Sequence, residues 1–125
     1  MLFRSVSSLR CNVTSITSLS DKRDKKDINS VSNSLNILNQ LRPVSFVWNT
    51  RDGSKNGIKS SGFIAQEVQP IIPELVTTFN NEDGEEYFGL ETNGVYTILV
   101  KAIQELSAKI DSQQNEINDL KNTIK

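Results

Sequence analysis

The stretch at residues 99–124 reads LVKAIQELSAKIDSQQNEINDLKNTI and carries the clearest periodicity in the chain. Its repeating positions alternate steps of four and three, and all but one are apolar: Leu99, Ile103, Leu106, Ile110, Gln113, Ile117, Leu120 and Ile124. This heptad pattern predicts a coiled coil, with isoleucines at position a and mostly leucines at position d. Glu116 at position g and Lys121 at the following position e can pair between parallel chains.

The heptads leave the number of helices in this coiled coil open. Isoleucine at a with leucine at d favours two strands. The polar Gln113 at a d position can fix both register and oligomer state, at some cost in stability. The pattern is therefore compatible with a dimer or a trimer.

Upstream of this long helix, the sequence predicts a small α+β body of short helices and β-hairpins. A short helix is expected over residues 31–41, because four apolar residues there have helical spacing and Pro43 marks the stop. The remaining expected elements are strands at 45–48 and 58–64, a turn at 49–53, a brief helix at 65–69, and a hairpin pairing 76–79 with 87–90 with Asp83 and Gly84 near its tip. Trp48 and Phe63 are assigned to the core.

Composition narrows the classes of function. One domain is expected at 125 residues, and 36% hydrophobic with 6% aromatic residues is little for a large monomeric core, so association would add stability. A net charge of −1 gives no basic field for nucleic acid and no polybasic patch for a membrane, although Lys22, Lys25 and Lys26 cluster. With no histidine and a lone Cys11, we expect no internal disulfide, no metal and no other cofactor. No apolar run is long enough for a transmembrane helix.

Residues 1–19 differ from the rest of the chain. They carry Arg4 and Arg10 and many serines, and no acidic residue precedes Asp21. A mitochondrial transit peptide has this composition. Residues 13–19 also alternate apolar with polar side chains, as a half-exposed strand at the end of a β-rich fibre stalk would. We favour the strand, because the alternation runs directly into the charged segment that follows.

Directly after this alternation, Leu19 and Ser20 precede the charged run DKRDKKD at residues 21–27, and Ser20 lies five residues ahead of Lys25. In a chain without histidine, a lysine kept neutral by desolvation is the usual base for a nucleophilic serine. Lys25 is therefore the candidate base for Ser20. A serine and an aspartate before a charged run are also typical of a helix cap.

Four further stretches follow these residues in order: 41–53, 62–68, 73–76 and 99–106. Over roughly residues 17–120, the series resembles the C-terminal intramolecular chaperone domain of phage tailspikes and tail fibres, the self-cleaving serine peptidase type known from endosialidases and found also in myelin regulatory factors. In that family, the cleavage serine opens a Ser-Asp-x-Arg-x-Lys motif, which Ser20, Asp21, Arg23 and Lys25 match. The resemblance implies a Ser-Lys dyad, cleavage of the Leu19–Ser20 bond and a homotrimer.

The resemblance implies the following organisation and function. Residues 1–19 would be an upstream segment that is cut off, 20–97 the chaperone and peptidase body, and 98–125 the coiled coil. The partners would be two further copies of the chain and an upstream fibre segment, in a virion tail precursor made in the host cytoplasm. Because only nineteen residues precede Ser20, the chain is expected to be a fragment, a split gene product or a free-standing domain.

Gln66 and Glu67 admit two interpretations. A carboxylate could orient or tune Lys25, or both side chains could brace the turn before Pro70, which we favour. Two alternatives to the self-cleaving chaperone also stay open. One is a structural trimerisation module that does not cut, and the other is a small adaptor with a transit peptide and a partner-binding C-terminal helix.

Overall fold

The computed structural model describes residues 12–15, 17–80, 82 and 84–124. The chain divides into two compact units. One contains the described residues up to Ser30 together with 45–61, and the other contains 31–44 and 62–124.

The first unit contains most of a two-stranded sheet, β1 (Val44–Val47) with β2 (Lys59–Gly62). Beyond β1, the Trp48 amide donates to the Ile58 carbonyl at 2.8 Å. The predicted turn is confirmed, since Gly53 and Gly57 have φ values of +75° and +86°, which favour glycine. Trp48 is half-buried, and its ring lies edge-on to that of Phe46 at 4.9 Å. Trp48 thus packs within this hairpin arm, and its assignment to the buried core was wrong.

The core lies in the second unit, where α2 (Ala65–Val68), η2 (Pro73–Leu75) and the start of α3 (Thr92–Thr123) meet. Four buried apolar residues form it: Val68, Ile72, Leu75 and Ile98. Phe63 is half-buried against this cluster, as predicted. The helix α3 approaches η2 so closely that a Cβ on Gly94 would collide with the Leu75 side chain.

The predicted hairpin is confirmed. β3 (Val76–Asn80) pairs antiparallel with β4 (Glu86–Leu90), and Phe79 is opposite Tyr87. Their rings stack with centroids 5.6 Å apart, which adds a cross-strand contact to the ladder. Gly84 near the tip has φ +80°, and Asp83 lies outside the described residues.

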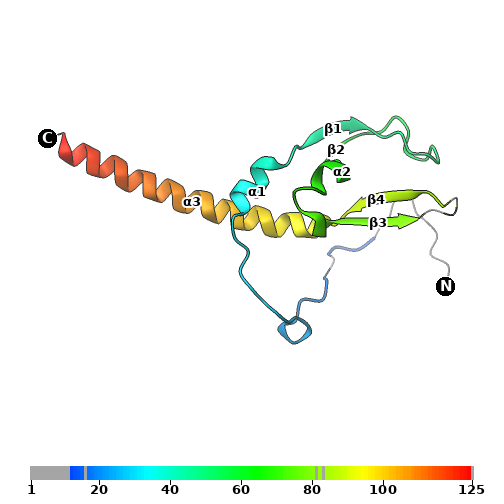
Figure 1. Ribbon diagram of the computed structural model, residues 1–125, viewed down its shortest axis with the longest axis horizontal. Coiled ribbons are helices and arrows are strands. Elements are labelled where there is room, and N and C mark those ends of the chain that lie inside the picture. The colour runs from blue at the N-terminus through cyan, green and yellow to red at the C-terminus, as the bar shows by residue number, and fades with distance from the viewer. Residues whose placement is uncertain (1–11, 16, 81, 83, 125) are drawn as a thin grey trace. The chain divides into compact units, whose positions relative to one another are not determined.

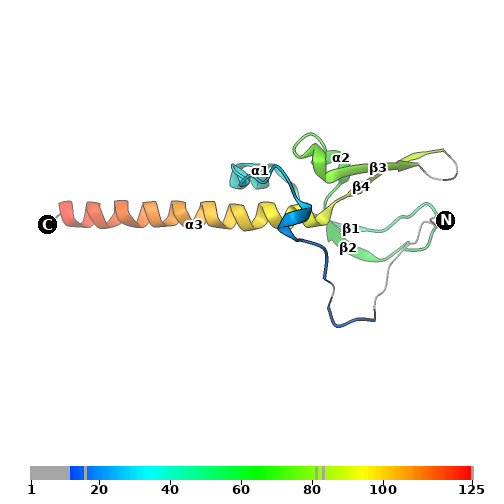
Figure 2. The same ribbon diagram turned by 90° about the horizontal axis from the view of Figure 1, so that it is seen from below.

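The helix α1 (Ser34–Gln40) lies alongside the first part of α3 in both views (Figures 1 and 2). It begins later than predicted, because Asn33 takes a left-handed conformation at φ +58° and leaves Val31 outside the helix. Small side chains on the two helices, Ser34 and Ala102, are both buried. This placement allows the two backbones to approach closely.

Glu105 of α3 caps the start of α1. Its carboxylate accepts hydrogen bonds from the Ser34 amide at 3.0 Å and the Leu35 amide at 2.9 Å. The first amides of a helix have no partner within the helix, and a negative charge there is favourable. Glu105 thus joins the two helices across 71 positions of sequence.

Replacing Glu105 by glutamine is expected to lower the melting temperature and to reduce its dependence on acid pH. The amides of Leu35 and Ser34 hold the pKa of Glu105 below its ordinary value of 4.5. A depressed pKa contributes stability that is present above 4.5 and is lost as pH falls through the folded value. Thermal melts from pH 7 downward measure this effect, with Asp111→Asn on the same helix as the control. Equal acid sensitivity in the parent and in Glu105→Gln would contradict the capping role.

The predicted long C-terminal helix is confirmed as α3, which has 32 residues. Ile98 and Ala102 on one face are buried in the body, whereas every residue from Leu106 to Ile124 is exposed. The heptad positions are therefore uncovered, with Ile103 65% and Leu120 63% exposed. The coiled-coil partner stays a prediction.

The expected strand at residues 13–19 is not formed, because the described residues 12–15 and 17–19 belong to no helix or strand. A stalk strand pairs with neighbouring strands, and the described chain places none beside it. Arg4, Arg10 and Cys11 lie outside the described residues. Among the helices of the described ranges, none is both long and apolar enough to cross a membrane.

Candidate functional site

A short turn in the first unit brings Ser20 and Lys25 together. Residues Lys22–Asp24 form a single turn of 3-10 helix, η1. The Asp24 amide donates to the Asp21 carbonyl at 3.1 Å, and the Lys25 amide donates to the Lys22 carbonyl at 3.2 Å. This turn reverses the chain between the serine and the lysine, so side chains five positions apart face each other.

The Lys25 ammonium group donates a hydrogen bond to the Ser20 hydroxyl oxygen, with Nζ and Oγ 2.7 Å apart. This contact lies within one chain, and it brings together the two residues that the sequence predicts as a dyad. Both side chains are exposed. An ammonium group has three donors and no lone pair with which to accept a proton, so cleavage requires that Lys25 first become neutral.

Asp21 and Arg23 bind each other within the same turn. Asp21 Oδ1 accepts from the Arg23 amide at 2.8 Å and from Arg23 Nε at 3.0 Å, and Oδ2 accepts from Nη2 at 2.9 Å. The bonds from the Arg23 guanidinium, and then that from the Arg23 amide, hold the pKa of Asp21 below its ordinary value. The same pairing raises the pKa of Arg23. Both oxygens of the Asp21 carboxylate therefore accept hydrogen bonds from Arg23.

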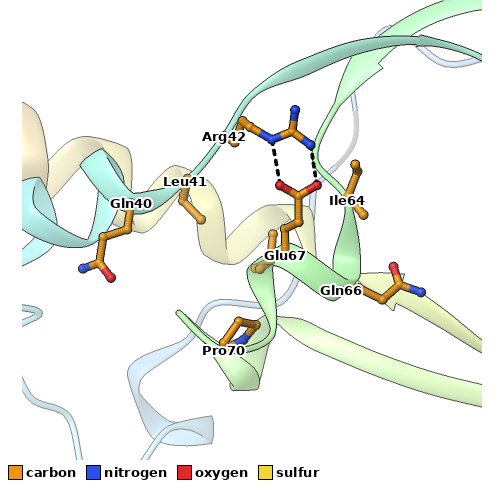
Figure 3. A pocket seen from close by; sticks show the side chains of 8 residues that line it. Gln40, Leu41, Arg42, Ile64, Gln66, Glu67 and Pro70 are labelled. Carbon is orange, nitrogen blue, oxygen red and sulfur yellow. Dashed lines mark hydrogen bonds and ion pairs between the residues drawn. The ribbon is translucent and has the colours of Figure 1, made fainter.

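Gln66 and Glu67 belong to the second unit, on α2. Glu67 accepts two hydrogen bonds from Arg42, from Nε to Oε1 and from Nη2 to Oε2, both at 2.7 Å (Figure 3). This pairing lowers the pKa of Glu67 and raises that of Arg42. Gln66 points away from the pair (Figure 3). The pairing with Arg42 is compatible with the bracing role that we favour for Glu67. An effect of Gln66 or Glu67 on Lys25 stays a prediction.

The Arg42–Glu67 pair borders an open cavity of about 400 Å³ in the second unit. Its lining combines apolar and polar side chains: Gln40, Leu41, Arg42, Ile64, Gln66, Glu67, Val68 and Pro70. Sequence reasoning did not single out Arg42, whose partner is 25 positions away. No local signal in the sequence marks such a pair.

Within the described ranges, His, Cys, Asp and Glu side chains form no group of three that could hold a metal ion. The turn at residues 20–25 presents a serine hydroxyl, a lysine amine and a neighbouring ion pair.

The described chain contains a serine that accepts a hydrogen bond from a lysine, and it ends in a long helix. Residues 20–77 match the family model described as chaperone of endosialidase, and this match begins at Ser20. The chain is also 31% identical over 74 residues to the long tail fiber protein Gp37 of Salmonella phage S16. This match covers 59% of the chain and 10% of that relative.

These two matches support, for residues 20–77, the C-terminal chaperone domain of phage fibres that the sequence predicts. The predicted resemblance is confirmed at this level. The family is of the self-cleaving serine peptidase type.

Proposed function

We propose that this chain is the intramolecular chaperone of a phage tail fibre or tailspike, and that it releases itself by cutting the Leu19–Ser20 bond. Ser20 is the nucleophile and Lys25 is the base. The observation that carries this proposal is the 2.7 Å contact between Lys25 Nζ and Ser20 Oγ. The family match that begins at Ser20 supports it.

In the proposed reaction, assembly buries the turn, and the loss of water disfavours the charged form of Lys25. The neutral amine takes the Ser20 proton, and Oγ attacks the Leu19 carbonyl carbon. The Leu19–Ser20 C–N bond breaks, the Ser20 nitrogen takes up a proton as a free amine, and an ester joins Leu19 to Ser20 Oγ. Water then hydrolyses the ester, which leaves a carboxyl group on Leu19 and restores the serine hydroxyl.

Assembly is proposed to occur through the exposed heptads of α3. Apolar residues in water favour burial against other chains, and this stripe repeats with coiled-coil spacing over four isoleucine positions: Ile103, Ile110, Ile117 and Ile124. Because the heptads are compatible with two or three strands, the homotrimer rests on the family resemblance. The trimer would hold three copies of an upstream fibre segment in register while that segment folds, as part of a virion tail precursor.

A second candidate function is a trimerisation module that does not cut. It is favoured by one observation, the exposure of both Ser20 and Lys25 in the described chain. A module that never buries this turn would assemble without cleaving.

The experiment that tests the proposal is the intact mass of the recombinant chain with an N-terminal tag. We expect the assembled chain to lose the tag together with residues 1–19, which leaves a product that begins at Ser20. Full mass in an assembled chain would instead support the non-cleaving module. A cut upstream of Leu19 that depends on a foreign protease would support the adaptor with a transit peptide.

A further inference from the structure

We infer that Asp21 and Arg23 are positioning residues for the proposed cleavage, because their mutual pairing folds the turn that holds Lys25 Nζ against Ser20 Oγ within one chain. The inference rests on the proposed function for its role in cleavage. The geometry of the turn can be measured independently of that function.

Three hydrogen bonds join Asp21 and Arg23, which are two positions apart. Both carboxylate oxygens of Asp21 bind the Arg23 guanidinium, at 3.0 and 2.9 Å, and Oδ1 also accepts from the Arg23 amide at 2.8 Å. Asp21 itself is extended, with φ −71° and ψ 136°, and caps the 3-10 turn that follows. An aspartate cap that accepts a backbone amide favours the folded turn over open conformations of the same segment.

The turn has a direct consequence for the dyad. Its backbone bonds, Asp24 to Asp21 and Lys25 to Lys22, lie between the serine and the lysine. Without the turn, Ser20 and Lys25 would be the ends of a flexible six-residue segment. Holding two reacting groups in contact lowers the entropy that the reaction must otherwise lose.

The pairing also determines which charges act on Lys25. An unpaired carboxylate beside a lysine favours its charged form, and a nearby cation disfavours it. Because Asp21 binds Arg23, the two side chains together are neutral. Lys22, Asp24, Lys26 and Asp27 are the other charged residues of this segment, and the substitutions of Asp21 and Arg23 described below leave them unchanged.

The test measures the rate and pH profile of self-cleavage in the full chain. Asp21→Ala is expected to slow cleavage about three- to tenfold, the scale of losing one helix cap, while the oligomeric state is unchanged. The control Asp24→Ala removes a carboxylate from the same turn but none of the bonds to Arg23, and it should cleave at the parent's rate.

The pH midpoint of cleavage separates positioning by the ion pair from a purely structural role. Arg23→Gln leaves the Asp21 carboxylate unpaired and should move the midpoint to higher pH, whereas Asp21→Asn leaves Arg23 unpaired and should move it to lower pH. The double variant should return to the parent's midpoint while staying slower. A common midpoint in all variants, or a parent rate in Asp21→Ala, would overturn the inference.

A second measurement keeps this inference distinct from the proposed function. In the isotope-labelled full chain, NMR cross-relaxation between the Lys25 ε-methylene and the Ser20 β-methylene reports their contact without any cleavage. We expect this cross-relaxation signal in the parent. If the parent cleaves, we expect it in Ser20→Cys instead. In Asp21→Ala the signal should be lost. If the parent is not cut but shows the signal, and Asp21→Ala lacks it, the cleavage claim is contradicted and the positioning claim is supported. An equal signal in Asp21→Ala would overturn the positioning claim.

Discussion

Replacing either Ser20 or Lys25 by alanine is expected to abolish self-cleavage, so that an N-terminal tag stays attached at all times. Ser20→Ala removes the only oxygen that contacts the Lys25 amine in the described structure, and Lys25→Ala removes the base. Loss of a nucleophile or of its base costs several orders of magnitude in rate for dyads and triads. Intact mass over a time course measures the effect, and Lys26→Ala, the adjacent lysine, is the matched control.

Mixed assemblies test whether the dyad forms within one chain, as the 2.7 Å contact indicates. Differently tagged Ser20→Ala and Lys25→Ala chains, folded together, should both stay uncut. If the lysine acted across chains, the Lys25→Ala chain would be cleaved with the help of its neighbour's lysine. Mixing each variant with the parent shows that mixed assemblies form. Cleavage of the Lys25→Ala chain in the variant mixture, but not when that chain is folded alone, would contradict an intrachain dyad.

The second large effect is expected at the exposed heptads. Ile110→Asp should abolish assembly, because Ile110 occupies an a position and is 55% exposed in the described chain. In a coiled coil this position faces the other helices, and an uncompensated carboxylate buried there is strongly unfavourable. Light scattering after size-exclusion chromatography measures the oligomeric state, and circular dichroism checks that α3 remains helical.

Cleavage should disappear in the same variant, because the proposed neutralisation of Lys25 depends on assembly. The matched control is Asn115→Asp, which adds the same charge at position f, on the outside of the predicted coiled coil. An Ile110→Asp chain that still assembles like the parent would exclude the heptads as the interface. One that fails to assemble yet still cleaves would show that burial by neighbouring chains is not needed.

Several elements were predictable because their patterns are local. The 76–79 and 87–90 hairpin and the long C-terminal helix follow from alternation and heptad spacing, and both are confirmed. The helix α1 was predicted three residues early, since apolar spacing cannot show that Asn33 adopts a left-handed conformation. The strand expected at 13–19 was wrong, because alternation indicates a strand only where another strand is available to pair.

The candidate site divides in the same way. The pairing of Ser20 with Lys25 was implied by the family motif, since their spacing alone is equally typical of a helix cap, and the structure shows that a single 3-10 turn brings the two side chains into contact. Their catalytic role stays a prediction. Asp21 and Arg23 were singled out only because they match the family motif, whereas the structure shows that they bind each other within the turn. Which partner an exposed charged residue selects depends on backbone angles that composition and spacing leave open.

The periodic elements, the absence of histidine and the serine–lysine spacing can be read from the amino-acid sequence, because they are properties of the residues themselves and of their near neighbours. The contacts of Glu105 with α1 across 71 positions and of Arg42 with Glu67 across 25 positions become visible only in the folded chain. The folded chain also shows that Ile98 and Ala102 of α3 are buried against the body, whereas the heptad positions from Ile103 onward are exposed. Periodicity shows that one face of a helix is apolar, but only the packing of distant segments determines which part of that face the chain covers itself.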